Sequence, residues 1–367
     1  MKSHLGQVGP LRNNLCISRF HFGISKKHQF RHFSVRYVVR TPVSRKMFKE
    51  KHLKHFVEVL MLINLQQILA DNTPIDLVSQ DFVIAGWQLR LVGQSAWLAA
   101  FGLALNHARV LDTQPDLIVH LRGHRPNLEQ LDTQTVRWLE PDNQDSIQLL
   151  DLTTGVGLCV CAIPLRTYQQ CAPLLHMLQA FLETKNMTLV HAAAVALRGK
   201  AALLVGRGGS GKSTTALLCL KHGLDYLGDD YCAVQTEPKA KVFGVYSSAK
   251  FHAAERLGFM TARQNPDLEK HFAMLSSTYH LQLPLQASIQ AVFLPTLADE
   301  LQIKEITAQT ALLSLAPSTM FQLKTGPMVF SWLGRLVQKV PCYRLSLGQN
   351  PDHIAPLLQG FLEGLSS

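Results

Sequence analysis

Residues 206–213 read Gly-Arg-Gly-Gly-Ser-Gly-Lys-Ser and fit the pattern G-x-x-x-x-G-K-[ST] of a phosphate-binding loop. Glycines let the backbone curl so that successive N–H groups point at phosphate oxygens. In such a loop Lys212 reaches the β- and γ-phosphates of a nucleotide, and the Ser213 hydroxyl holds Mg²⁺. The predicted nucleotide-binding residues are Gly206, Arg207, Gly208, Gly209, Ser210, Gly211, Lys212, Ser213 and Thr214.

The segments on both sides of this loop support the motif. Residues 201–205 are a short apolar run typical of a buried strand, and residues 214–222 predict a helix that stops at Gly223. Before them, residues 189–197 predict another strand, joined to the first by a tight turn at 198–200. Strand, glycine loop and helix are the arrangement in which the motif binds phosphate, so a chance match in a glycine-rich turn is disfavoured. The preceding hairpin is unlike ordinary phosphate-loop ATPases, where a parallel crossover is more typical.

Two adjacent carboxylates, Asp229 and Asp230, follow one helix later, and Asp229 is 17 residues after Lys212. Alternation along a strand predicts that their side chains point in different directions, one toward a metal ion and one toward an acceptor. A solvated Asp-Asp turn is the structural alternative. The distance from the phosphate loop favours a functional role.

Composition bounds the class of protein. The 367 residues suffice for two domains or one large one, and 47% hydrophobic with 17% charged residues is ordinary for a globular protein. The seven cysteines are an odd number without a C-x-x-C pair, which argues against a disulfide framework or a zinc site. They favour a reducing compartment, and we expect a cytoplasmic protein. The sequence contains no run of 18 apolar residues, so no membrane span is predicted.

The positive charge of the chain is concentrated at its start. Residues 1–56 carry 13 Lys and Arg and one acid, Glu50, whereas the remainder carries 23 Lys and Arg and 25 acids. The high pI of the whole chain, near 9.3, therefore results from this segment, and we do not expect nucleic acid as a partner. The segment could be a basic arm, a transit peptide or, less well, a secretory signal. We favour a disordered tail, or a natural start at Met47 that leaves residues 1–46 outside the native protein.

Hydrophobic periodicity predicts two domains after this tail. Residues 57–183 predict an α+β domain, and residues 184–367 predict an α/β catalytic domain. In the first, strands are expected at 82–91, 117–121, 136–139, 147–152 and 156–162, and helices at 57–70, 96–110 and 165–183 with a kink at Pro173. In the second, strands are expected at 242–246, 288–294 and 343–347, and helices at 252–259, 308–315, 328–340 and after Asn350-Pro351. Cys159 and Cys161 are expected in the core.

Residues 189–234 resemble the HPr kinase/phosphorylase superfamily, and most of all its HPr-kinase-related serine kinases. The histidine strand, the hairpin into the loop and the acidic pair carry the resemblance, and a weaker likeness continues through 287–294 and 341–345. About half of the chain is covered. The resemblance implies an α/β fold related to phosphoenolpyruvate carboxykinases, with ATP and Mg²⁺ as ligands and a serine hydroxyl as acceptor. It also makes self-association an expectation.

By the same resemblance, His191, Lys212, Asp229 and Asp230 are catalytic. Asp229 and Asp230 supply the base and a metal contact, with the two roles left open between them. Ser213, Asp230 and Glu255 are the implied metal ligands, although the signature around a metal-binding glutamate is only approximated by residues 254–258. That departure puts HPr as substrate, and a reverse phosphorylase activity, in doubt.

His191 and one further residue, Lys250, also have purely structural interpretations. His191 can be a hydrogen-bonded core histidine. Lys250, which could touch phosphate, is expected to be an exposed lysine.

The sequence thus favours a Mg·ATP-dependent kinase acting on serine in a protein or peptide, or on a small molecule. An NTPase or nucleotide switch is the first rival, but its usual later strand ending in Asp is not found. A non-catalytic nucleotide-binding adaptor is the second, and the intact Lys212, Ser213, Asp229 and Asp230 argue against it.

Overall fold

The computed structural model describes residues 22–24, 33–35, 64–71, 76–129, 131–132, 134–139, 146–252, 263–265 and 270–365. The chain divides into two compact units, Met1–Leu62 and Ile63–Ser367. In the first unit, the described strands β1 (Phe22–Ile24) and β2 (Phe33–Val35) pair antiparallel. The rest of the predicted basic tail lies outside the described residues.

The second unit begins with a mixed seven-stranded sheet. Its strands are β3 (Val78–Ile84), β4 (Trp87–Gly93), β5 (Arg109–Val110), β6 (Leu117–Arg122), β7 (Val136–Leu139), β8 (Ser146–Asp151) and β9 (Val156–Cys161). Their order in the sheet is β5-β3-β4-β6-β9-β8-β7. The helices of this part are α2 (Leu65–Asp71), α3 (Ser95–Gly102), η1 (Asn106–Ala108), α4 (Thr167–Cys171) and α5 (Leu175–Thr184).

Both faces of this sheet are covered, and successive side chains along each strand point to opposite faces. On β6, Leu117, Val119 and Leu121 enter a core that also contains residues of α3 and α5. On β9, Val156 and Leu158 face the other way and pack in the hydrophobic cluster of α2.

A second, nine-stranded sheet follows. Its strands are β10 (Met187–Val190), β11 (Ala192–Leu197), β12 (Lys200–Val205), β13 (Asp225–Gly228), β14 (Cys232–Gln235), β15 (Lys241–Gly244), β19 (Gln286–Thr296), β20 (Leu301–Ile306) and β21 (Cys342–Leu347). The path runs β10-β14-β15-β19-β12-β11-β13, and β21 pairs with β19 and β20. A small sheet contains β16 (Ser248–Phe251), β17 (Arg263–Asn265) and β18 (Lys270–Met274). The helices are α6 (Lys212–Lys221), α8 (Leu275–Tyr279), α9 (Ala308–Leu323), α10 (Pro327–Lys339), η2 (Pro351–His353) and α11 (Ile354–Gly364).

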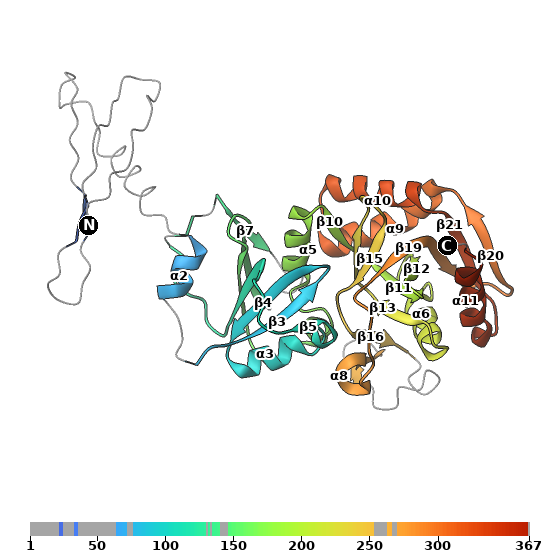
Figure 1. Cartoon of the computed structure of the whole chain (residues 1–367), viewed down its shortest axis with the longest axis horizontal. Coiled ribbons are helices and arrows are strands. Elements are labelled where there is room, and N and C mark those ends of the chain that lie inside the picture. Colours follow the sequence, from blue (N-terminus) through green and yellow to red (C-terminus); the bar gives the residue numbers. More distant parts are fainter. Residues whose placement is uncertain are drawn as a thin grey trace, which may run out of the picture. The chain divides into compact units, whose positions relative to one another are not determined.

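The central strands of the nine-stranded sheet are apolar throughout because both of their faces are buried. Leu203 and Val205 of β12 pack in a cluster with α9 and α10, whereas Ala202 and Leu204 pack with α6 and α11. The sheet is therefore the middle layer between two pairs of helices, and this part of the chain is a mixed α/β structure (Figure 1).

Most elements expected in the second half are present. The hairpin of β11 and β12 turns through Arg198 and Gly199, and α6 ends just before Gly223, whose φ is +98°. Helix α9 is longer than expected, and strand β20 was not predicted. The helix expected at 252–259 falls almost wholly outside the described residues.

Three expected elements are each split in two. Residues 82–91 were predicted as one strand, but Ala85 and Gly86 form a two-residue turn with φ of 52° and 85°, the geometry of a tight hairpin. The predicted kink at Pro173 is a break between two helices: α4 ends at Cys171, and Leu174 adopts a left-handed conformation just before α5. The strand predicted over 189–197 is interrupted at His191.

The helix expected at 96–110 is also shorter than predicted. It ends at Gly102 and is followed by the short helix η1 and strand β5.

The two sheets share one hydrophobic cluster. Phe82 and Leu91 of the first sheet lie in the same cluster as Leu189 and Phe243 of the second. The predicted domain boundary at 183/184 coincides with the change of sheet, and the division into two domains stays a prediction.

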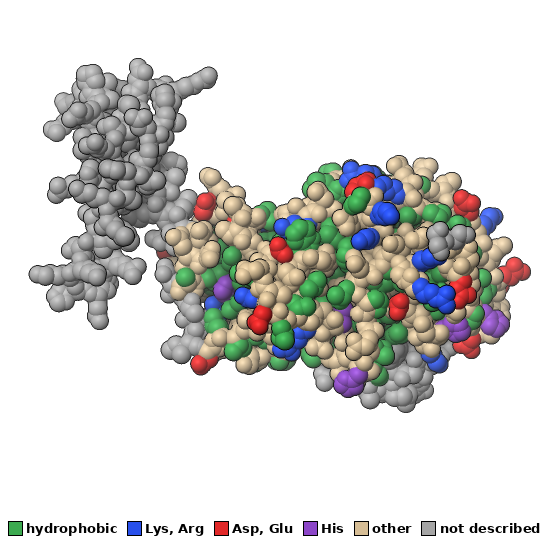
Figure 2. Space-filling view, viewed as in Figure 1, with side chains coloured by type: hydrophobic (Ala, Val, Ile, Leu, Met, Phe, Trp, Pro, Cys, Tyr) green, Lys and Arg blue, Asp and Glu red, His purple; other side chains and the backbone are tan. Residues whose placement is uncertain are grey.

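The cysteines of the described residues, at 159, 161, 171, 219, 232 and 342, are free and buried, and Cys159 and Cys161 lie in the core as expected. On the face drawn in Figure 2, basic and acidic side chains are interspersed. None of the helices in the described part of the chain has both the length and the apolar character needed to cross a membrane.

Candidate functional site

The phosphate-binding motif forms a glycine loop between β12 and α6. Gly206, Gly209 and Gly211 have φ of +139°, +79° and +99°, a region that other residues rarely adopt. Gly211 immediately precedes the first turn of α6, and a Cβ at this position would overlap the side chain of Leu347. The loop conformation therefore depends on the glycines of the motif.

Lys212 folds back over the loop that precedes it. Its Nζ donates to the carbonyl oxygens of Gly206 at 2.8 Å and Arg207 at 3.1 Å, and the residue is only 5% exposed. A cation is thus held against the loop whose backbone is expected to meet phosphate. The exposed side chains of Arg207 and Thr214 lie at the surface of the loop and of the helix.

Several features of the loop fit a bound phosphate chain. Nothing lies within 4 Å of where a Cβ would stand at Gly208 or Gly209, so the crest of the loop faces open space. The Ser210 hydroxyl is buried and has no hydrogen-bond partner among the described residues. A buried polar group of this kind calls for a partner.

The Ser213 hydroxyl donates a 2.7 Å hydrogen bond to Oδ1 of Asp229. Asp229 is 4% exposed, and it also accepts from the backbone N–H groups of Asp230 at 2.9 Å and Lys250 at 3.2 Å. The structure therefore brings together two side chains that the sequence places 16 residues apart. A hydroxyl and a carboxylate side by side at a phosphate loop are the protein groups that hold Mg²⁺ in this class of site.

The acidic pair lies in an interruption of a β-ladder. Val190 pairs with Cys232 and Ala194 pairs with Gly228, so β10 with β14 and β11 with β13 follow one continuous register. Between these pairs, residues 191–193 and 229–231 face each other without strand pairing. This gap places His191 and both aspartates at the end of β12 where the glycine loop begins, because Ala192 pairs with Val205.

The two aspartates have different partners, although not because of strand alternation. Asp230 has a φ of +63°, so the chain turns out of the strand at this residue. Its carboxylate forms an ion pair with Nζ of Lys250 at 2.7 Å, and the side chain of Asp230 is 28% exposed. The prediction that the pair lies on a strand is therefore wrong. The two side chains point in different directions, Asp229 to Ser213 and Asp230 to the ammonium group of Lys250, and their roles toward a metal ion and an acceptor stay predictions.

Lys250 on β16 was expected to be exposed, but it is part of the site. Its side chain is only 18% exposed, its N–H donates to Asp229 and its ammonium group contacts Asp230. Burial lowers the pKa of Lys250, and the negative charge of Asp230 and other neighbouring groups raises it by more, so Lys250 remains a cation. No spacing rule connects Lys250 to the loop, because β16 belongs to another sheet.

The pKa of Asp229 is displaced upward. Burial is the largest cause and the charge of Asp230 the second; the hydrogen bonds from Ser213 and Lys250 oppose them, and the pKa rises from 3.8 to about 6. A buried carboxyl next to a second carboxyl is expected to behave in this way. A positive charge next to Asp229 would favour the ionised form of its carboxyl group.

This displaced pKa predicts how stability changes with pH. The folded state holds the proton of Asp229 more tightly than the unfolded chain does. Protonated Asp229 therefore makes its full contribution to the free energy of unfolding below pH 3.8, and this contribution is lost as pH rises through about 6. The loss is about 3 kcal/mol at most. Urea unfolding at intervals from pH 4 to 7 should show this slope in the wild type and lack it in Asp229→Asn. The matched variant Asp225→Asn, at the exposed start of β13, should keep the slope; a slope unchanged in Asp229→Asn would contradict the assignment.

His191 lies beside the acidic pair, at the break between β10 and β11. It is 5% exposed, its backbone N–H donates to Oγ1 of Thr319 at 3.1 Å, and its ring lies 5.9 Å from that of Tyr231. Tyr231, to which the sequence assigned no role, donates its hydroxyl hydrogen to Gln322. His191 is thus a buried, ring-packed residue next to the site.

The remaining predicted ligand cannot be placed. Glu255 and residues 254–258 around it lie outside the described residues. Of the predicted metal ligands that are described, Ser213 donates its hydrogen bond to Asp229, and Asp230 forms an ion pair with Lys250.

Comparisons with known proteins add little to this geometry. No family model and no curated protein matches the chain. Among solved structures, the HPr(Ser) kinase/phosphatase from Coxiella burnetii is similar over 47% of this chain and 95% of its own, with 9% identity and a TM-score of 0.29. A TM-score this low supports no argument about fold or function.

Proposed function

We propose that this protein is a Mg·ATP-dependent kinase that transfers the γ-phosphoryl group to a serine hydroxyl of a protein or peptide. The observation that carries the proposal is the hydrogen bond from Ser213 to the buried Asp229, next to a glycine loop held by Lys212. The likeness of residues 189–234 to HPr-kinase-related serine kinases points the same way. In this proposal residues 184–367 are the catalytic domain and have the phosphoenolpyruvate carboxykinase-like architecture.

The residues at the loop fit ATP and Mg²⁺. Mg·ATP, when bound, supplies the transferable phosphoryl group and neutralises part of its charge. The backbone of residues 206–211 and Lys212 would bind the phosphates, and Ser213 with Asp229 would hold the metal ion. Magnesium sites of this kind use one or two carboxylates together with phosphate oxygens and water.

Asp230 is the residue we assign as base. A serine hydroxyl becomes a better nucleophile when a carboxylate accepts its proton as the new bond forms. Asp230 is more exposed than Asp229 and forms an ion pair with Lys250, whereas Asp229 accepts the hydrogen bond from Ser213. Lys250 contacts both residues, so we infer that it orients Asp230 and separates the two negative charges.

A nucleotide hydrolase is the competing function, because Lys212, Ser213 and Asp229 would serve it equally well. The second carboxylate with its own lysine favours the kinase, since a metal site alone does not require it. A non-catalytic adaptor would require neither Asp230 nor Lys250.

The fate of the γ-phosphoryl group separates these functions. Purified protein is incubated with Mg²⁺ and γ-labelled ATP, with and without lysate from its source, and α-labelled ATP serves as the control for simple nucleotide binding. A kinase gives one discrete acceptor with label on serine from γ-labelled ATP only. Steady release of free phosphate without a labelled acceptor would replace the kinase by a hydrolase, and no turnover at all would favour the adaptor.

A further inference from the structure

A buried arginine lies far along the sequence from the glycine loop, on the face of the first sheet that α2 covers. Arg122 ends strand β6 and is level with Val160 of β9, so it shares a face with the apolar cluster of Leu69, Leu158 and Val160. It is 8% exposed. A lone cation in an apolar cluster is an expensive arrangement unless another charge meets it.

The structure provides no such partner within its described residues. Both terminal nitrogens of Arg122, Nη1 and Nη2, are buried without a hydrogen-bond partner there. Burial lowers the pKa of Arg122, but a guanidinium group stays protonated in proteins. His120, two residues earlier on the same face, has a pKa lowered to about 4 by burial and by the charge of Arg122, so it is neutral at pH 7.

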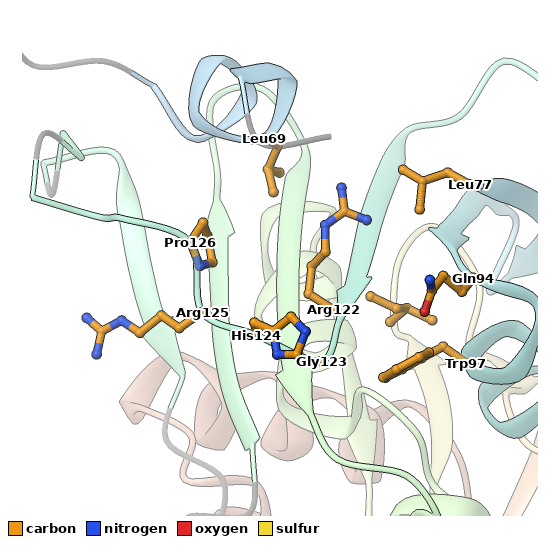
Figure 3. A pocket seen from close by; sticks show the side chains of 10 residues that line it. Leu69, Leu77, Gln94, Trp97, Arg122, Gly123, His124, Arg125 and Pro126 are labelled. Carbon is orange, nitrogen blue, oxygen red and sulfur yellow. The ribbon is translucent and has the colours of Figure 1, made fainter. Parts of the chain in front are cut away.

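Arg122 lines a cavity of about 300 Å³. Figure 3 shows its guanidinium group directed to the same side as Leu69 of α2 and Leu77, with Trp97 and Gln94 on another wall. The described lining contains no Asp or Glu. Cavities of this size are at the lower end of those that hold small ligands, and an apolar lining with a few polar groups is their usual composition.

The neighbouring Arg125 is engaged elsewhere. Its guanidinium carbon lies 5.4 Å from the centre of the Trp138 ring, and Figure 3 shows it extending away from Arg122. Arg122 is therefore the cation that a ligand in the cavity would meet first. One buried guanidinium group matches one singly charged, planar acceptor that can take two parallel hydrogen bonds, which is a carboxylate.

We propose that this cavity binds a small organic carboxylate, with the carboxylate group on Nη1 and Nη2 of Arg122 and the apolar part against Leu69, Leu77 and Trp97. The site is independent of the nucleotide site, and its test does not depend on kinase activity. Such a ligand supplies two acceptor oxygens and the opposite charge to a buried cation, whereas its neutral amide supplies one acceptor oxygen and no charge.

The test is calorimetric titration of the full chain with acetate, phenylacetate and 3-phenylpropionate, beside the neutral 3-phenylpropanamide and inorganic phosphate. We expect 3-phenylpropionate to bind, and the amide to bind at least about tenfold more weakly, because a hydrogen-bonded charge pair is lost. This comparison needs no variant. Equal binding of acid and amide, stronger binding of phosphate, or no binding by any of the three carboxylates would overturn the proposal.

Two variants that each remove one positive charge test whether the ligand binds at Arg122. Arg122→Leu should lose the binding of 3-phenylpropionate, whereas Arg125→Leu should keep it. Without ligand, Arg122→Leu should unfold at the same or a higher temperature than the wild type, because it removes a buried unpaired charge. A lower melting temperature in Arg122→Leu together with unchanged carboxylate binding would show that Arg122 is structural; Arg122→Gln repeats the binding test with a polar side chain.

Discussion

Replacing Lys212 with alanine is expected to reduce ATP-dependent phosphoryl transfer by about 10²- to 10³-fold or more. Two effects combine. The ammonium group that would neutralise the phosphates is lost, and so are its hydrogen bonds to the carbonyl groups of Gly206 and Arg207 that hold the loop. Initial rates with labelled ATP measure the loss, and ATP titration measures the accompanying weaker binding.

The matched control for this variant is on the same helix. Lys221 is in the last turn of α6, is exposed and does not belong to the loop. Lys221→Ala should retain the wild-type rate and ATP affinity. Full activity in Lys212→Ala would show that the glycine loop does not serve the reaction.

Replacing Asp230 with asparagine is expected to reduce phosphoryl transfer by about 10²- to 10⁴-fold, the range of a positioned general base. Nucleotide binding should persist, because Asp230 forms an ion pair with Lys250, whereas Asp229 is the carboxylate that accepts from Ser213 at the loop. Asp229→Asn should instead weaken the Mg²⁺ dependence of ATP binding and reduce transfer with it. The two variants thus separate the roles that the sequence left open between the two residues.

Asp225→Asn is the control for both, because it changes a carboxyl at the exposed start of β13. Its activity should equal that of the wild type. Normal transfer by both Asp229→Asn and Asp230→Asn would remove the acidic pair from the mechanism. Loss of transfer and binding to the same degree in both would show that they act as one metal site.

The glycine loop and its flanking elements could be predicted because their signals are local. The apolar run before Gly206, the glycines and the helix that stops at Gly223 are consecutive in sequence, and each has its own conformational reason. The hairpin turn at Arg198 and Gly199 could be predicted from the same kind of signal.

The rest of the site depends on pairings between distant segments. Asp229 and Asp230 lie in a gap between two strand pairs that share one register, and a single sequence does not reveal register. Lys250 arrives from a separate sheet, so its ion pair with Asp230 could not be read from spacing. The turn at Ala85 was missed because alanine seldom adopts a positive φ.

The proposed function requires that Ser213 and Asp229 hold Mg²⁺ beside a nucleotide bound by the glycine loop. Calorimetric titration of ATP with and without Mg²⁺ tests it, using the wild type and the double variant Ser213→Ala with Asp229→Asn. We predict that Mg²⁺ tightens ATP binding by the wild type and has no such effect on the double variant. Equal ATP affinity of the wild type with and without Mg²⁺, or an undiminished Mg²⁺ effect in the double variant, would contradict a metal site at Ser213 and Asp229.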